Sequence, residues 1–341
     1  MIRLLQAMAG ADRGGAEGFF ERLAPALQRA GVEQQVLIRT NPRRAAALRE
    51  AGVDVTELPF GGLLDVRTRL GFAKAVRDFR PTVVLTWMNR ASRFCPKGNF
   101  VRVGRLGGYY DLKYYRGFDH LIGNTQDIVD WIVGQGWNPS RVHYVPNFVA
   151  ASKAPAVSRK ELGTPDGVPV ILGLGRLHPN KAFDTLIAAL AHVPAAHLWL
   201  AGEGPLRAEL ETQAASLGVL DRVRFLGWRE DVAGLFAAAD LFVCPSRHEP
   251  LGNVVIEAWA QGISVIAAAS EGPRQLITDG EDGLLVPVDA PEPMGQAIAR
   301  LLAEPDVAAR LGAAGRQAYE RTFTEDAVVA CYLDFFAKVA R

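Results

Sequence analysis

Cysteine is scarce in this chain, with three among 341 residues, at positions 95, 244 and 331. Their odd number and wide spacing fit neither a disulfide framework nor a cysteine-ligated metal, and they favour a reducing compartment. Uninterrupted apolar runs of about 18 residues, as a membrane-spanning helix requires, are missing. Residues 1–8 predict a short strand and lack the flanks of a signal peptide. We therefore expect a cytoplasmic protein.

Several common catalytic motifs are missing too. The sequence has no Ser-His-Asp order, no metal-ligand spacing and no phosphate-binding P-loop. The segment that starts at Gly173 begins like a dinucleotide-binding fingerprint, but His178 occupies the position of its third glycine. This departure argues against a nicotinamide cofactor.

Neither sign of charge predominates overall, because the formal net charge is +1. The distribution is nevertheless uneven: residues 1–150 contain 21 Lys and Arg against 13 Asp and Glu, and the remainder contains 17 against 24. The largest imbalance is in residues 65–116, with 12 basic and three acidic residues. A basic half predicts an anionic partner, either acidic lipid, a phosphorylated acceptor or nucleic acid. The alternative is a solvated face that only aids solubility.

The sequence does contain a repeated alternation of strand and helix patterns. The first series extends from a predicted strand at 2–8 to one at 142–145. Residues 147–159 have linker composition, and a second series begins with the predicted strand at 169–174. Strands that alternate with helices predict parallel sheets covered on both faces. We expect an α/β protein with two facing Rossmann-like domains and a cleft between them. The predicted domains are residues 1–150 and 160–323, followed by a helix at 324–341.

Two carboxylates surround a turn in the second half. Glu249 follows a predicted buried strand at 241–244, and Glu257 falls within a helix that we expect to start near Leu251. The N–H groups of residues 251–253 would be free at that helix start, and free N–H groups of this kind bind anions such as phosphate. Two carboxylates on either side of a phosphate-binding site suggest that the ligand is a nucleotide sugar. The alternative is that both acids are ordinary solvated residues.

Cationic side chains follow the strand at 169–174. Arg176 and Lys181 both emerge from its end, one as a planar fork and the other as a point charge. Together they would neutralise a diphosphate leaving group, although a surface pair without a ligand is the alternative.

Glycine turns follow other strands. Gly14 and Gly15 lie between the first strand and the first helix, where glycine allows close approach of a ligand to the backbone. Gly204 ends another strand of the second series, and the Gly227–Trp228 loop offers an apolar wall to a nucleobase. Loop flexibility and simple packing of Trp228 are the alternatives.

Together these segments resemble glycosyltransferase family 4, the retaining transferases of GT-B fold. The resemblance rests on Gly14-Gly15-Ala16-Glu17, Gly175-Arg176-Leu177 with Lys181, Gly202-Glu203-Gly204, Phe225-Leu226-Gly227, the Glu249–Glu257 pair, and Gly280-Glu281-Asp282-Gly283. It spans most of the chain and is closest from about residue 168 to residue 288.

The resemblance implies a role for each matched position. Gly15, Arg176 and Lys181 would hold the donor diphosphate, with Arg176 and Lys181 stabilising the charge that develops on it. Glu249 would contact sugar hydroxyls as a catalytic residue and Glu257 the ribose hydroxyls. The remaining donor-binding positions are Gly175, Gly204, Trp228, Leu251, Gly252 and Asn253. The resemblance also implies that no metal and no cofactor is needed, and that the helix at 324–340 crosses back to the first domain.

One position departs from the family pattern. Relatives often have a histidine after the fourth strand of the first domain, where this chain reads Thr86-Trp87-Met88-Asn89-Arg90. Asn89 would offer a hydrogen bond there but no acid–base chemistry at neutral pH. We expect Arg90 and Arg93 to face a phosphorylated acceptor.

The sequence thus predicts a retaining, metal-independent hexosyltransferase that uses a nucleotide sugar. The expected acceptor is a cell-envelope glycolipid, an oligosaccharide or a lipopolysaccharide core intermediate. We expect peripheral contact with the anionic inner face of a membrane and no nucleic acid partner. Two alternatives remain open: a nucleotide-sugar epimerase of the same fold, and a non-catalytic sugar-nucleotide binding protein.

Overall fold

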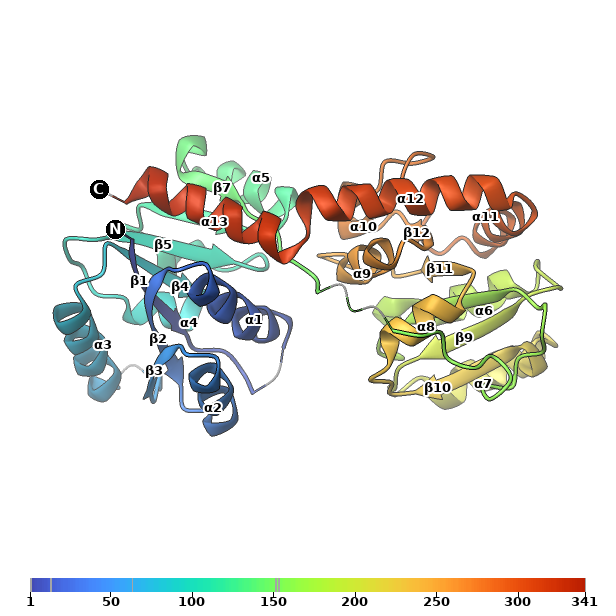
Figure 1. Ribbon diagram of the computed structural model, residues 1–341, viewed down its shortest axis with the longest axis horizontal. Helices are drawn as coiled ribbons and strands as arrows, with labels where there is room; N and C mark the ends of the chain where they lie inside the picture. The colour runs from blue at the N-terminus through green and yellow to red at the C-terminus, as the bar shows by residue number, and fades with distance from the viewer. Residues whose placement is uncertain (1, 13, 63, 151, 153, 341) are drawn as a thin grey trace. The chain divides into compact units, whose positions relative to one another are not determined.

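The chain folds into two compact units (Figure 1). The computed structural model describes residues 2–12, 14–62, 64–150, 152 and 154–340. Unit 1 comprises Met1–Phe148 and Glu325–Arg341, and unit 2 comprises Val149–Thr324. Three positions of the predicted glycine turn and linker lie outside the described residues: Arg13, Ala151 and Lys153.

Unit 1 is built on a seven-stranded parallel sheet of order β3-β2-β1-β4-β5-β6-β7. Parallel strands need long crossovers, and helices supply most of them. The strands are β1 (Arg3–Met8), β2 (Glu33–Arg39), β3 (Asp54–Leu58), β4 (Val83–Trp87), β5 (Val101–Leu106), β6 (His120–Gly123) and β7 (Val142–Tyr144). The helices are α1 (Gly15–Arg29), α2 (Pro42–Glu50), α3 (Val66–Phe79), α4 (Met88–Phe94), η1 (Leu112–Tyr115), α5 (Gln126–Gly134), η2 (Pro139–Arg141) and α13 (Glu325–Val339).

The last helix, α13, packs into the core of unit 1. Its buried side chains, including Tyr332 and Phe336, join α1 and the central strands in one apolar cluster. The buried guanidinium of Arg105 on β5 donates to the Tyr332 hydroxyl at 2.8 Å and lies 4.5 Å from the centroid of the Trp87 ring. A buried cation needs such partners because burial removes its hydration. These contacts hold α13 on the sheet of unit 1.

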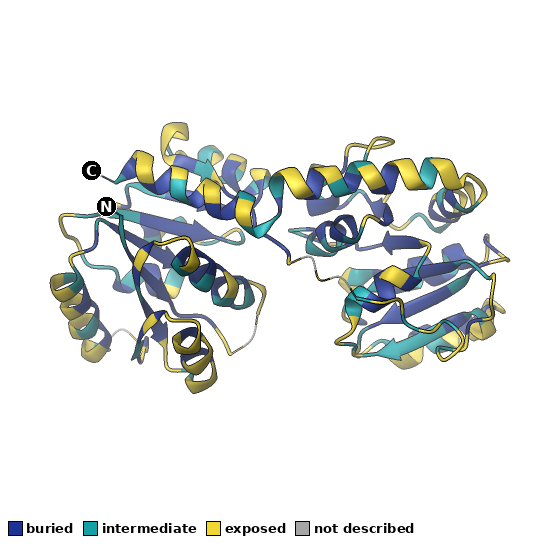
Figure 2. Cartoon of the chain, in the orientation of Figure 1, coloured by how far each residue is buried: buried dark blue, intermediate teal, exposed yellow. Residues whose placement is uncertain are grey.

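Unit 2 has a six-stranded parallel sheet of order β10-β9-β8-β11-β12-β13. Its strands are β8 (Val170–Leu174), β9 (His197–Ala201), β10 (Val223–Gly227), β11 (Leu241–Cys244), β12 (Ser264–Ala268) and β13 (Leu284–Val286). Its helices are η3 (Pro179–Lys181), α6 (Phe183–Leu190), α7 (Arg207–Ser216), η4 (Leu220–Arg222), α8 (Val232–Ala238), α9 (Asn253–Gln261), α10 (Glu271–Leu276), α11 (Pro291–Ala303) and α12 (Pro305–Thr322). Figure 2 shows the strands of both sheets as largely buried, with exposed residues concentrated on helices and loops.

The strand order of each sheet reverses at one point. In unit 1 the reversal lies between β1 and β4, and in unit 2 it lies between β8 and β11. Open parallel sheets bind ligands at the carboxyl ends of the strands on either side of such a reversal. A ligand site in unit 2 is therefore expected at the loops after β8 and β11.

The predicted α/β fold with two Rossmann-like domains is confirmed by these two parallel sheets. Two details were wrong or missing. Helix α9 begins at Asn253, not at Leu251, because Gly252 has a left-handed conformation with φ of +68° and ends the preceding loop. Helices α4 and α5 were not predicted. In the described part of the chain, no helix is both long enough and apolar enough to span a membrane.

Candidate functional site

The site in unit 2 is built from loops at the carboxyl edge of its sheet. Lys181 follows β8 and Glu249 follows β11, the two strands on either side of the reversal in strand order. The Lys181 ammonium donates a hydrogen bond to the Glu249 carboxylate and forms an ion pair with it. Glu249 is 7% exposed. A nearly buried carboxylate needs such a partner because burial removes its hydration.

Glycines let the loops after β8 and β9 approach one another. Gly202 has φ of +145°, and a Cβ there would lie 1.9 Å from the carbonyl oxygen of Gly175. A Cβ on Gly204 would lie 2.3 Å from the carbonyl oxygen of Leu177. Both distances are far below van der Waals contact, so only glycine fits. The structure thus gives Gly204, predicted as a donor-binding residue, a role in packing two loops together.

A cavity of about 390 Å³ lies beside this loop cluster. It brings together four of the predicted site residues: Gly175, Arg176, Trp228 and Glu257. Its remaining lining residues are Leu174, Ala201, Gly202, Glu203, Arg229, Val232 and Val254. Trp228 is 73% exposed, so its ring offers a free face at the cavity wall. The combination of apolar wall, cation and carboxylate is typical of a small-ligand site.

Lys181 lies next to the cavity lining. Its aliphatic carbons pass close to Gly175, since a Cβ on Gly175 would lie 3.3 Å from the Lys181 Cε. Arg176 is exposed, and among the described residues it forms no ion pair. Two cations therefore stand near Gly175, one paired with Glu249 and one available to an anion.

Backbone groups anchor the loop that carries Glu249. The N–H of Gly272 donates to the Glu249 carbonyl at 2.7 Å, and a Cβ on Gly272 would lie 2.7 Å from the Gly252 nitrogen. Glu271 reaches the same loop through its carboxylate, which contacts the His248 ring at 2.9 Å. Burial raises the pKa of Glu271, but its backbone hydrogen bond and His248 outweigh that effect and lower the pKa overall. Glu271 is therefore ionised at neutral pH.

The start of α9 presents backbone N–H groups. Gly252 is the N-cap and provides no side-chain acceptor. Within the part of the chain that the structure describes, no hydrogen bond is donated by the N–H groups of Leu251, Gly252 or Asn253. Glu257 lies one turn further along α9 and lines the cavity. The predicted cluster of N–H groups is thus present, although the helix starts two residues later than expected.

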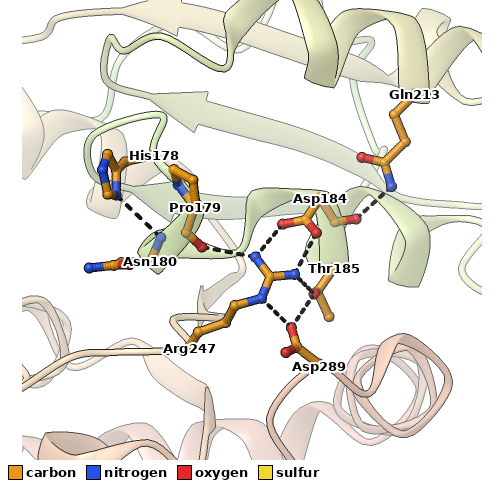
Figure 3. A network of polar contacts seen from close by, with 8 residues as sticks. All are labelled: His178, Pro179, Asn180, Asp184, Thr185, Gln213, Arg247 and Asp289. Carbon is orange, nitrogen blue, oxygen red and sulfur yellow. Dashed lines mark hydrogen bonds and ion pairs between the residues drawn. The ribbon is translucent and has the colours of Figure 1, made fainter.

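A network around Arg247 fixes the base of the same loop (Figure 3). Its guanidinium donates to Asp184 at 2.9 and 2.5 Å and to the Pro179 carbonyl at 2.8 Å, and it forms an ion pair with Asp289 at 2.5 Å. Asp184 holds the pKa of Arg247 above its ordinary value, and Arg247 in turn outweighs the burial that would raise the pKa of Asp184. Arg247 thereby connects the β11–α9 loop to η3 and α6, which surround Lys181.

Residues predicted in the first half lie in unit 1. Gly15 begins α1 after the turn that follows β1, and Asn89, Arg90 and Arg93 lie on α4, which follows β4. These elements share the carboxyl edge of the unit 1 sheet at its reversal point. Oδ1 of Asn89 and one terminal nitrogen of Arg93 are buried and have no hydrogen-bond partner among the described residues. Buried polar atoms without partners are rare, and bound water, an ion or a polar ligand group can complete them.

Sequence reasoning missed three charged residues at these edges. Arg247 stands two positions before Glu249, but its partner Asp184 is 63 residues away, which the sequence pattern does not reveal. Glu271 was not among the predicted site residues. Glu17, 5% exposed, accepts a hydrogen bond from the Ala11 N–H at 2.7 Å and closes the glycine turn of unit 1.

The charged residues of the cavity do not form a metal site. Among residues that the structure describes, no group of three or more His, Cys, Asp or Glu side chains is placed to hold a metal ion. The cavity lining contains two arginines and two glutamates, Arg176, Arg229, Glu203 and Glu257. Arg229 is paired with Asp231.

Comparison with known proteins identifies two family models. Residues 156–318 match the model described as glycosyl transferases group 1, and residues 14–95 match the model described as a glycosyl transferase 4-like domain. The first match covers the whole loop cluster described above. The second includes Gly15 and α4.

Individual proteins match over nearly the whole chain. The lipopolysaccharide core biosynthesis glycosyltransferase LpsE of Rhizobium meliloti is 38% identical over 95% of this chain and 96% of its own. LpsD of the same organism, with the same description, is 38% identical over 95% of each chain. Among solved structures, Anabaena HepE in complex with UDP superposes with a TM-score of 0.85 at 20% identity, covering 99% of this chain and 100% of that one.

Proposed function

Because the chain belongs to the group 1 glycosyltransferases of GT-B fold, we propose that it transfers a sugar from a nucleotide-diphospho-sugar to a hydroxyl of a lipopolysaccharide core intermediate. One observation supports the proposal that unit 2 binds a nucleotide-sugar donor. The cavity at the carboxyl edge of unit 2 joins an arginine, a glutamate and an exposed indole next to the Lys181–Glu249 pair.

Each chemical group of the donor has a binding partner at the carboxyl edge of the unit 2 sheet. The nucleobase stacks against Trp228, and Glu257 accepts hydrogen bonds from the ribose hydroxyls. The diphosphate lies against Arg176, Lys181 and the N–H groups of residues 251–253, where fixed positive charge and helix-start N–H groups favour an anion. Glu249 accepts hydrogen bonds from the sugar hydroxyls. A uridine donor is favoured, since a solved protein of the same fold was crystallised with UDP.

The reaction proceeds with retention of the anomeric configuration. The acceptor oxygen attacks the anomeric carbon on the face that the diphosphate leaves, so the new C–O bond forms as the bond to the phosphate oxygen breaks. That phosphate oxygen receives the proton of the acceptor hydroxyl. Arg176 and Lys181 stabilise the negative charge that develops on the leaving diphosphate. These cations and the α9 N-terminus act in place of a metal ion, and no cofactor takes part.

The acceptor is proposed from the relatives. LpsE and LpsD are described as lipopolysaccharide core glycosyltransferases, and each matches this chain almost end to end. On unit 1, Asn89, Arg90 and Arg93 provide hydrogen bonds and positive charge for a phosphorylated oligosaccharide or glycolipid. The buried Oδ1 of Asn89, which has no partner among the described residues, supports a polar ligand there. A glycolipid acceptor places the enzyme at the inner face of a membrane, and no nucleic acid partner is expected.

A turnover assay tests the proposal. Purified protein is incubated with UDP-glucose or UDP-galactose, without added metal, in the presence and absence of lipopolysaccharide core acceptors of successive length. We expect release of UDP that depends on the acceptor and a product lengthened by one sugar. An epimerase would convert the donor without any acceptor, and a binding protein would bind the donor and leave it intact. Either of those results would replace the transferase proposal.

A further inference from the structure

A tyrosine ring is exposed at the carboxyl edge of the unit 1 sheet. Tyr109 follows β5 in the segment 107–110, which reads Gly-Gly-Tyr-Tyr, and it is 49% exposed. Its aromatic neighbours Tyr110, Tyr114 and Trp131 are partly buried and pack against the apolar cluster beneath them. Because parallel sheets bind ligands at this edge, an exposed aromatic ring here is a candidate ligand contact.

Two contacts from α5 hold the Tyr109 ring in place. The ring packs edge-on against Trp131, with ring centroids 5.4 Å apart, and its hydroxyl donates a hydrogen bond to the Asp127 carboxylate. Asp127 and Trp131 are four residues apart and therefore lie on the same face of α5. A side chain that is already held in this way loses little conformational entropy when a ligand binds to its exposed surface.

An asparagine with an unsatisfied amide oxygen lies beside this segment. Asn124 directly follows β6, which pairs with β5, and it is 5% exposed. Its Oδ1 is buried and has no hydrogen-bond partner among the described residues. A Cβ on Gly107 would lie 3.6 Å from the Asn124 Nδ2 and 3.8 Å from the Tyr110 hydroxyl, so these groups meet at the ends of β5 and β6. An amide both donates and accepts, so a ligand hydroxyl can complete it.

The charges around the exposed ring do not favour an anion. Asp111 forms an ion pair with Lys113, and Lys113 chiefly, with a smaller contribution from Arg116, lowers the pKa of Asp111. On α5, Asp127 and Asp130 are both acidic. A phosphate group would meet these carboxylates, whereas uncharged hydroxyl groups can donate hydrogen bonds to them. This segment therefore suits an uncharged, hydroxyl-rich ligand, in contrast to the arginines of α4.

We propose that Tyr109 and Asn124 form a subsite for an uncharged sugar ring of the acceptor. The exposed surface of the Tyr109 ring packs against the C–H groups of the sugar, and the Asn124 amide hydrogen-bonds one of its hydroxyls. Two strand spacings, about 10 Å, separate the end of β6 from the end of β4, where α4 begins. The inference rests on the proposed transferase function and adds that unit 1 recognises a sugar of the acceptor separately from its phosphate.

Binding of a delipidated, dephosphorylated lipopolysaccharide core oligosaccharide to the full chain tests the inference. Saturation-transfer NMR detects contact between aromatic side chains and sugar C–H groups, and calorimetry measures the affinity. We expect the parent protein to bind this oligosaccharide and Tyr109→Ser to weaken the binding about tenfold, because the stacking surface is lost. Asn124→Ala is expected to weaken it about threefold or more, because a sugar hydroxyl loses its amide partner.

Two control variants separate stacking from other effects. Tyr109→Phe keeps the ring and loses only the hydroxyl contact with Asp127, so its affinity should stay within about twofold of the parent value. Leu220→Ser removes a 42% exposed apolar side chain from unit 2 and should bind like the parent protein. Melting temperatures of all variants show whether each one retains the folded structure.

The outcomes separate this subsite from the proposed transferase function. Unchanged affinity of Tyr109→Ser or Asn124→Ala, at an unchanged melting temperature, would overturn the subsite. Binding of only the phosphorylated oligosaccharide would overturn it too, because the parent protein would then recognise phosphate and not an uncharged ring. If the parent protein bound neither form, the subsite would be refuted, and a dimer lost in Tyr109→Ser would assign the ring to a protein partner. UDP titration of the same samples reports on the donor site alone.

Discussion

Lys181 and Glu249, which are 68 residues apart in the sequence, form an ion pair at the carboxyl edge of the unit 2 sheet. The sequence predicted separate roles for them, with Lys181 on the diphosphate and Glu249 on the sugar. The observed pair adds a constraint, because the two side chains now determine each other's position. A donor whose phosphate and sugar hydroxyls meet at this point would contact both at once.

Breaking this pair should affect both stability and donor binding. Lys181→Met leaves the nearly buried Glu249 carboxylate without its cation, which we expect to lower the free energy of unfolding by about 3 kcal/mol. Affinity for a UDP-sugar should fall at least about tenfold, because a cation near the diphosphate is lost. Urea denaturation and calorimetry measure the two effects.

The double variant Lys181→Met/Glu249→Gln separates these effects. It removes the uncompensated charge, so most of the lost stability should return while donor affinity stays low. Restored affinity in the double variant would show that Lys181 acts only as the partner of Glu249 and would contradict its role on the diphosphate.

Arg247 is expected to act as a positioning residue. Arg247→Gln removes the contacts to Asp184 and Asp289, but both acids are partly exposed, so the loss of stability should stay below about 2 kcal/mol. The rate constant kcat should fall more strongly, by about tenfold or more, because the loop carrying Glu249 loses its attachment to η3 and α6. Steady-state kinetics with a fixed acceptor provides the measurement.

The conservative variant distinguishes position from charge. Arg247→Lys keeps the charge but not the planar fork, so kcat should recover only in part. Arg300→Gln, on α11 and paired with Glu304, is the matched control and should leave kcat unchanged. A kcat for Arg247→Gln equal to that of the control would show that Arg247 does not position the loop that carries Glu249.

A histidine pair predicts pH-dependent stability of unit 1. A ring nitrogen of His143 lies 3.0 Å from one of His120, and the His143 ring packs edge-on against Phe335 of α13. Burial, then His120 and then Lys338, lower the pKa of His143 to about 4. Because the folded pKa lies below the ordinary value of about 6.5, the folded state favours neutral His143. Its contribution is therefore complete above about pH 6.5 and is lost as the pH falls towards 4.

Melting temperatures across this window measure the effect. The difference between the parent protein and His143→Gln should shrink, or reverse sign, as the pH falls from about 6.5 to about 4. A constant difference for His143→Gln would mean that His143 does not sense pH.

Much of the fold and part of the site follow from local sequence patterns. Alternating strands and helices predicted both parallel sheets, and Arg176, Lys181 and Glu249 were correctly placed after the ends of strands. These predictions succeed because parallel strands place their carboxyl ends together. The start of α9 was misplaced by two residues, since the local sequence pattern did not reveal the left-handed conformation of Gly252.

Other features depend on contacts between distant residues. Pairing of Arg247 with Asp184 requires the tertiary structure, as does the hydrogen bond from Arg105 to Tyr332, which joins residues 227 apart. On α3, apolar residues occur on both faces, so periodicity alone could not tell buried Phe72 from exposed Leu70. The sequence predicted a basic surface in this region but not its apolar centre.

The central claim is that the edge of unit 2 binds the diphosphate of a nucleotide sugar, and calorimetric titration with UDP-sugars tests it most directly. The parent protein should bind one UDP-sugar without added metal. Arg176→Ala should weaken that binding about tenfold or more, since an exposed cation at the cavity is lost, while the control Arg300→Ala should not. Equal affinity in all three proteins, or no binding of any nucleotide sugar by the parent protein, would contradict the account.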